Sequence, residues 1–151
     1  MTRDYKELDV WNKSVDLAIE LYKLTARFDV TERYGMTSQI RRAGISIPGN
    51  IAEGWGRGSR GEYTQFLTIA RGSLMELETH LIIASKLQFI EADELVSALK
   101  KIKDIEKMLN RLIAVLKTGK RDREPASSLL NPESRIANPV SRAPVARIPR
   151  V

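Results

Sequence analysis

The sequence of 151 residues contains no cysteine and only one histidine, His80. Without cysteine, disulfide bonds and thiolate metal sites are excluded, and a single histidine leaves nearly all ligands of a metal centre to carboxylates. Di-metal bundles need paired Glu-x-x-His motifs, but Leu77 stands three positions before His80. We therefore expect no metal and no cofactor. A cysteine-free chain also fits a reducing cytoplasm.

Long apolar runs are also missing. Runs such as LIIA at 81–84 are far too short to span a bilayer, and the N-terminal MTRDYKELDV has no apolar core of an export signal. With 42% hydrophobic residues the chain can bury one ordinary core. The sequence predicts one unexported cytoplasmic domain without a membrane partner.

Proline is scarce until the end of the chain. Only Pro48 precedes Lys120, and the other five prolines stand at positions 125, 132, 139, 144 and 149, where they exclude a helix. The segment from Lys120 holds seven Lys or Arg against three Asp or Glu, whereas residues 1–119 hold 18 against 16. We therefore divide the chain into a folded domain, 1–118, and a basic, proline-rich tail, 119–151, which we expect to be extended or disordered.

The domain shows hydrophobic residues at alternating spacings of three and four, which is typical of amphipathic helices. The first seam comprises Leu8, Trp11, Val15, Ala18 and Tyr22, in a helix expected to reach about Phe28. A later seam comprises Tyr63, Leu67, Ala70, Leu74, Leu77, Leu81 and Ala84, and the last comprises Leu95, Ala98, Ile102, Ile105, Leu109, Leu112 and Leu116. The short FIEAD at 89–93 separates these two long helices. The pattern predicts an all-α, antiparallel up-down four-helix bundle.

The second helix contains the unusual segment SIPGNIAEGWGRGS, residues 46–59. Its seam, formed by Met36, Ile40, Gly44, Ile47 and Ile51, continues through Pro48, which predicts one helix kinked at this proline. The kink leaves backbone unpaired, to which Asn50 can donate, and Gly44 gives room for the bend. Gly56 or Gly58 is expected to end the helix, and Ser59 with Glu62 forms a capping box for the next.

Catalytic interpretations of this segment are weak. A phosphate-binding loop needs a lysine after its second glycine, but Trp55 follows Gly54 and no strand precedes the segment. Ser46 or Ser59 as a nucleophile would need His80 as its base, and His80 lies toward the far end of another helix. We therefore expect no enzymatic activity.

Residues 39–87, QIRRAGISIPGNIAEGWGRGSRGEYTQFLTIARGSLMELETHLIIASKL, resemble the small four-helix-bundle proteins encoded in intervening sequences of bacterial 23S rRNA genes. The resemblance extends over residues 5–118. It implies a bundle that assembles into a homo-oligomer, a pentameric ring. A more distant similarity, to the accessory variability determinant of diversity-generating retroelements, implies binding to nucleic acid and to a reverse transcriptase. The family's motif falls on Arg41, Arg42, Ser46, Ile47, Pro48, Asn50, Ile51, Ala52, Glu53, Gly54, Arg57, Gly72, Ser73, Leu74, Glu76 and Glu78.

Several motif residues have structural interpretations. We expect the mid-helix pair Gly72 and Ser73 to allow close helix packing, and Glu53 to form an ion pair with Arg57 or to act as a cap. The arginines are less easily assigned. We predict a nucleic-acid-binding set of Lys23, Arg27, Arg41, Arg42, Arg57, Arg60 and Arg71, because guanidinium groups suit phosphates. The alternative is a solvated surface paired with Glu53, Glu62 and Glu76.

Two functions remain open at this point. The first is a non-enzymatic oligomeric scaffold that binds RNA or DNA through its basic surface, as an accessory to a nucleic-acid enzyme. The second is a protein–protein interaction bundle without a nucleic-acid role, whose tail docks on another protein.

Overall fold

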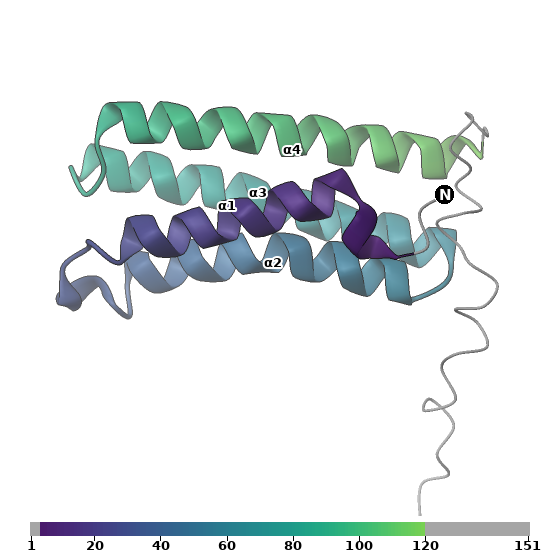
Figure 1. Ribbon diagram of the computed structural model, residues 1–151, viewed down its shortest axis with the longest axis horizontal. Coiled ribbons are helices and arrows are strands. Elements are labelled where there is room, and N and C mark those ends of the chain that lie inside the picture. Colours follow the sequence, from purple (N-terminus) through teal and green to yellow (C-terminus); the bar gives the residue numbers. More distant parts are fainter. Residues whose placement is uncertain (1–3, 120–151) are drawn as a thin grey trace, which may run out of the picture.

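The computed structural model describes residues 4–119, and this part of the chain is all-α, with four helices and no strand. The helices are α1 (Asp9–Thr25), α2 (Met36–Gly56), α3 (Arg60–Lys86) and α4 (Ala92–Thr118). Two single-turn 3-10 helices, η1 (Tyr5–Glu7) and η2 (Val30–Glu32), precede α1 and α2. The helices lie side by side, and each runs opposite to the one before it (Figure 1). The predicted all-α bundle is confirmed, whereas the tail from residue 120 onward lies outside the described residues.

The core follows the predicted seams in three of the four helices. All seven seam residues of α3 are buried, as are Ile40, Gly44, Ile47 and Ile51 of α2. In α4 the seam is buried from Ile102 to Leu109, while Leu95 and Ala98 are only partly buried. The hydrophobic period alone therefore places most of the core.

The seam predicted for α1 was wrong in part: Ala18 is buried, and Leu8 and Trp11 are partly buried against the core, but the centre of the buried face lies elsewhere. The buried face carries Val10, Ser14, Leu17, Leu21 and Thr25, whereas Tyr22 is 43% exposed. Ser14 and Thr25 are polar, so the spacing of apolar residues does not reveal that they belong to the buried face. Their burial costs little, because Ser14 donates to the carbonyl of Val10 at 2.6 Å and Thr25 to that of Leu21 at 2.7 Å.

The boundary between α2 and α3 is set by local chemistry. Gly58 has a φ of +76°, so the left-handed residue after α2 is Gly58 rather than Gly56. Ser59 then caps α3 by accepting from the backbone amide of Glu62 at 3.2 Å. The Ser59 hydroxyl in turn donates to the Glu62 carboxylate at 2.9 Å. The predicted Ser59 cap is thus confirmed, but Glu62 bonds the hydroxyl of Ser59 and not its backbone amide, as a full capping box requires.

Candidate nucleic-acid interface

A short polar link crosses the apolar boundary between α2 and α3. The hydroxyl oxygens of Ser46 and Ser73 lie 2.8 Å apart, and the Asn50 amide donates to the Ser46 hydroxyl at 2.9 Å. Asn50 also donates to the Ser46 carbonyl at 2.7 Å. This is not the carbonyl that Pro48 leaves without its amide, which belongs to Gly44. Asn50 therefore bonds Ser46, the α2 member of this link, and not the carbonyl that Pro48 leaves unpaired. The bend at Pro48 stays a prediction.

The glycines of the motif have different surroundings. A Cβ on Gly54 would lie 2.6 Å from the Cβ of Phe66 and 2.9 Å from the Tyr63 ring, so Gly54 lets α2 and α3 approach. A Cβ on Gly44 would lie 2.6 Å from a methyl group of Leu21, so this glycine makes room for α1. A Cβ on Gly72 would meet nothing within 4 Å. The prediction that Gly72 allows close packing was therefore wrong within the chain, and only its neighbour Ser73 is buried.

Glu53 and Arg57 form the predicted ion pair. Nη2 of Arg57 donates to Oε1 of Glu53 at 2.6 Å, and the guanidinium also lies over the ring of Phe66, 5.0 Å from its centroid. Both charged groups are about half exposed. Arg60, the first residue of α3, lies beside Gly119 at the end of α4. The charge of Arg57 is therefore paired with that of Glu53, whereas Arg60 contacts no carboxylate within residues 4–119.

Arg42 lies on the exposed side of α2 and shares a carboxylate with His80. Nη2 of Arg42 lies 3.7 Å from Glu76 and donates to the side chain of Gln39 at 3.0 Å. Glu76 also lies 3.2 Å from the His80 ring. The Arg42 side chain is 70% exposed, so its remaining N–H groups face solvent. The long, exposed contact to Glu76 screens this cation only weakly.

Arg41 is held by the C-terminal turn of α1. Its Nε donates to the hydroxyl of Thr25 at 2.8 Å, and Nη2 donates to the carbonyl of Tyr22 at 3.3 Å. The guanidinium lies 4.4 Å from the centroid of the Tyr22 ring. All of these partners are neutral, so Arg41 keeps its full charge in a fixed orientation, with N–H groups left to donate.

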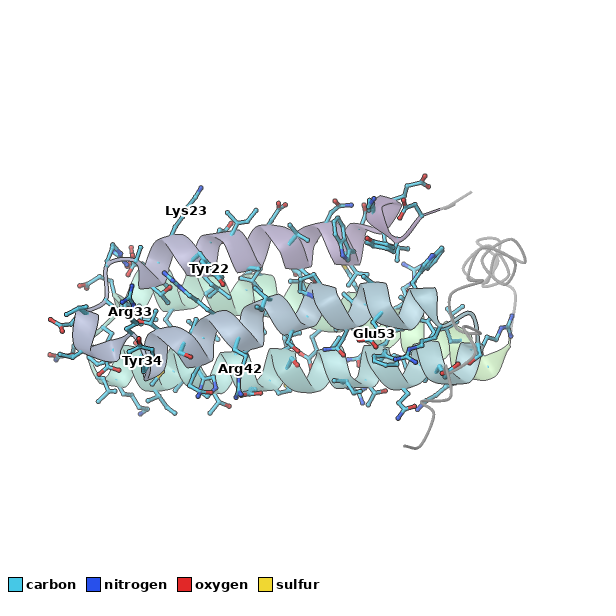
Figure 2. All side chains as sticks on the ribbon, turned by 90° about the horizontal axis from the view of Figure 1, so that it is seen from below. Tyr22, Lys23, Arg33, Tyr34, Arg42 and Glu53 are labelled. Carbon is cyan, nitrogen blue, oxygen red and sulfur yellow. The ribbon has the colours of Figure 1, made fainter. Side chains whose placement is uncertain are left out.

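The remaining predicted cations differ in their partners. Arg27 donates to Glu94 of α4 at 2.6 Å, and Arg71 donates to Asn110 of α4 at 2.9 Å. Lys23 contacts no carboxylate within residues 4–119 and points away from the bundle on the outer side of α1 (Figure 2). Arg27 thus links the end of α1 to α4, while no carboxylate within residues 4–119 offsets the charges of Lys23 and Arg71.

The seven predicted cations do not form one patch. Arg42 of α2 and Arg57, the residue directly after α2, are fifteen positions apart, which is about 22 Å along a helix. Figure 2 shows Arg42 toward one end of α2 and Glu53, the partner of Arg57, well along the same helix. Arg71 lies against α4 instead. A single nucleic-acid strand could therefore contact only part of this set at once. The part considered below is the end of the bundle near Arg42, where α1 is joined to α2 (Figure 2).

Two further side chains lie at that end. Arg33 and Tyr34 stand in the loop between α1 and α2, and they lie toward the same end of the bundle as Tyr22 and Arg42 (Figure 2). Tyr34 is 89% exposed, and Arg33 contacts no carboxylate within residues 4–119. The adjacent Arg-Tyr pair in a polar loop was the available signal, because basic and aromatic residues together favour nucleic acid. We name the set Tyr22, Arg33, Tyr34, Arg41 and Arg42 the basic end.

Positive charge exceeds negative charge in the segment that forms the basic end. Residues 22–42 hold five Lys or Arg and two Asp or Glu, whereas residues 4–119 as a whole hold 17 against 16. The two carboxylates serve the backbone: Glu32 accepts from the amide of Met36 at 3.1 Å, and Asp29 accepts from the amide of Thr31 at 2.8 Å. These Thr31 hydrogen bonds hold the pKa of Asp29 below its ordinary value. The segment from Tyr22 to Arg42 thus carries an excess of three positive charges, although α3 and α4 bring Glu76 to Arg42 and Glu94 to Arg27.

Other kinds of site find little support in the structure. Within residues 4–119, no three His, Asp or Glu side chains are placed to hold a metal ion. No helix among these residues is both long enough and apolar enough to cross a membrane.

The comparisons with known proteins agree with the fold. The family model described as "23S rRNA-intervening sequence protein" matches residues 6–111. A crystal structure of a protein of unknown function from Bacteroides thetaiotaomicron, assigned to the S23 ribosomal protein family, superposes with a TM-score of 0.61. It is 29% identical, and the match covers 69% of this chain and 97% of that one. A search of curated proteins finds no match. By the extent of the family match, this chain belongs to the 23S rRNA-intervening sequence protein family.

Proposed function

We propose that the protein is a non-enzymatic, homo-oligomeric scaffold that binds the phosphate backbone of RNA or DNA at its basic end. The observation that carries this proposal is the state of Arg41. Its guanidinium is oriented by Thr25 and Tyr22 but contacts no carboxylate within residues 4–119. A fixed cation without a counter-charge loses little entropy when it binds a phosphate.

The neighbours of Arg41 extend the same chemistry. Arg42 adds an exposed guanidinium, and Arg33 adds another from the loop. The exposed ring of Tyr34, and the face of the half-exposed Tyr22 ring that Arg41 does not cover, can stack on unpaired bases. Because stacking needs splayed bases, we expect single strands to bind more tightly than duplexes. The preference for one sequence should be weak, since phosphates carry no sequence information.

Oligomerisation would multiply this interface. Exposed apolar residues include Ile45 and Ile69 on α2 and α3, which lie on the opposite side of the bundle from α1 and α4. The two tryptophans contribute less apolar surface, because Trp55 is buried and Trp11 is partly buried. In a pentamer, the number implied by the family resemblance, five basic ends would act together and turn weak contacts into avidity.

The test is a salt titration of binding, by fluorescence anisotropy, with single-stranded RNA, single-stranded DNA and duplex DNA. The variant Arg33→Gln/Arg42→Gln should bind all three more weakly and lower the slope of log K against log salt by about 0.7 to 0.9 per lost phosphate contact. Changing Arg41 and Arg42 together to alanine should do the same. However, the loss of Arg41 also removes a link between α1 and α2.

Two controls separate the basic end from charge elsewhere. Lys107→Gln/Arg111→Gln removes two exposed cations of α4 and should leave the slope unchanged. The full-length chain with Arg142, Arg147 and Arg150 changed to glutamine tests whether the tail produces the signal alone. Loss of all binding in that chain, at low salt, would contradict the proposal and favour the alternative of a protein-interaction bundle.

A further inference from the structure

A groove runs between α1 and α4, on the side of the bundle where its helices pack more loosely. It consists of two adjoining hollows of about 270 and 200 Å³, which share Leu17 and Glu20. The floor of the groove is apolar and comprises the partly buried Leu24 and Ala98 together with the buried core residues Leu17, Leu21 and Ile105. A floor of this kind can receive the aliphatic side chains of an extended peptide.

The rim of the groove is acidic. It carries the carboxylates of Asp16, Glu20, Asp93, Glu94 and Asp104, against only Lys13 and Lys101. Two of the five carboxylates have cations in contact, because Glu20 pairs with Lys101 and Glu94 pairs with Arg27. Asp16, Asp93 and Asp104 contact no Lys or Arg within residues 4–119. This surface repels phosphates and fits a basic, partly apolar partner.

The chain itself contains a segment of that chemistry. Residues 134–151, SRIANPVSRAPVARIPRV, hold four arginines and no acidic residue. Aliphatic residues are interleaved with these arginines: Ile136, Val140, Val145, Ile148 and Val151. Prolines at every fifth position, 139, 144 and 149, keep such a peptide from forming a helix. Proline-rich peptides bind in grooves through side chains, with a small loss of conformational entropy.

The tail is long enough to reach every part of the groove. From Thr118, where α4 ends, Ile105 lies about 20 Å back along the helix and Asp93 about 38 Å back. The fourteen residues 120–133 can span about 45 Å when extended. Residue 134 can therefore reach even the far end of the groove, without the help of a second copy.

We propose that residues 134–151 dock in the α1–α4 groove of their own chain. Their arginines bind the carboxylates of the rim, and their isoleucine and valine side chains cover the leucine floor. The docked tail withdraws its own cations from nucleic acid. This intramolecular contact goes beyond the proposed function and does not depend on it.

The absence of cysteine provides a direct test. A single Ser141→Cys substitution in the full-length chain accepts one nitroxide spin label, whose effect on methyl NMR signals reports proximity. We expect strong broadening of the methyl signals of Leu17, Leu24 and Ile105. The signals of Ile45 and Ile69, on the far side of the bundle, should stay sharp and serve as the internal control.

Matched variants identify the charges responsible. Asp16→Asn/Asp104→Asn should reduce the broadening at the groove severalfold, whereas Asp16→Glu/Asp104→Glu, which keeps both charges, should retain it. Glu78→Gln removes one charge from α3 and should change nothing. These carboxylates are exposed or partly exposed, so we expect all variants to fold.

Dilution decides whether the contact is intramolecular. The spin-labelled, isotope-labelled protein is mixed with an excess of unlabelled protein that carries neither label, and the broadening should persist. Loss of broadening on mixing would show that another chain's tail fills the groove. Equal broadening on both sides of the bundle, or none, would show that the tail does not dock there. Each of these results would overturn the proposal.

Discussion

Ser46 and Ser73 face each other across the boundary between α2 and α3, with their hydroxyl oxygens 2.8 Å apart. Ser73 is 9% exposed, and the neighbours in both helix seams are apolar. Asn50 completes the group by donating to the hydroxyl and the carbonyl of Ser46. The polar groups at this boundary thus satisfy one another, which fixes the register of the two helices.

Ser73→Ala should lower the free energy of unfolding by about 1 kcal/mol, because it removes one partner of this link and leaves the Ser46 hydroxyl less well bonded. The matched control is Ser38→Ala, since Ser38 is exposed on the same helix as Ser46. The urea midpoint of each variant measures the effect. Equal midpoints for the two variants would show that the link contributes nothing.

Gly54→Ala and Gly72→Ala should have opposite effects. At Gly54 the new methyl group would press on the Cβ of Phe66, which cannot move without its backbone, so we expect a loss of about 1 to 3 kcal/mol. At Gly72 it meets open space, and the better helix propensity of alanine should add about 0.5 to 1 kcal/mol. Thermal unfolding measures both. A loss of stability or of oligomer in Gly72→Ala would indicate that Gly72 packs against another chain.

Tyr63 should make the protein sensitive to alkali. Burial raises the pKa of its hydroxyl above the ordinary value of 10.0, and the hydroxyl has no hydrogen-bond partner within residues 4–119. The folded state holds this proton more tightly than the unfolded state. The contribution to stability is therefore complete below pH 10 and lost as the pH rises above it.

Tyr63→Phe should abolish that part of the alkaline loss, and at neutral pH it should be neutral or stabilising by up to about 1 kcal/mol. Urea midpoints from neutral pH to about pH 11 measure the difference. Tyr34→Phe is the control, because Tyr34 is 89% exposed. The same alkaline slope in Tyr63→Phe and the parent protein would contradict the assignment.

Truncation after Gly119 should leave the bundle folded, because all four helices end by Thr118. The helical circular dichroism signal per chain should stay nearly unchanged, because the residues removed are not expected to be helical, and a cooperative thermal transition should remain. Disappearance of the transition would show that residues 120–151 belong to the folded domain.

Light scattering coupled to gel filtration should return a mass of five chains of 17.1 kDa each, at micromolar protein concentration. The expected number comes from the family resemblance, and the exposed Ile45 and Ile69 provide apolar surface for neighbours. A monomer under these conditions would contradict the oligomeric scaffold.

The sequence by itself determined the helices, the boundary between α2 and α3 and most of the core. The seam from Tyr63 to Ala84 and the cap formed by Ser59 and Glu62 are local patterns, in which each residue acts on others within one or two turns. Local rules of this kind need no knowledge of the neighbouring helices. They failed for α1, where the buried Ser14 and Thr25 do not carry the apolar signal.

Only the tertiary structure decided which charges are free. Arg27 pairs with Glu94, 67 positions away, and Lys101 pairs with Glu20, 81 positions away. Arginines that look alike in the sequence therefore have different roles in the structure. Arg27 links the end of α1 to α4, Arg57 pairs with Glu53 of α2, and Arg41 contacts only neutral groups. These outcomes depend on how far each helix is rotated about its axis and on which helix lies beside it. Packing of the whole chain sets both quantities, and no short stretch of sequence contains them.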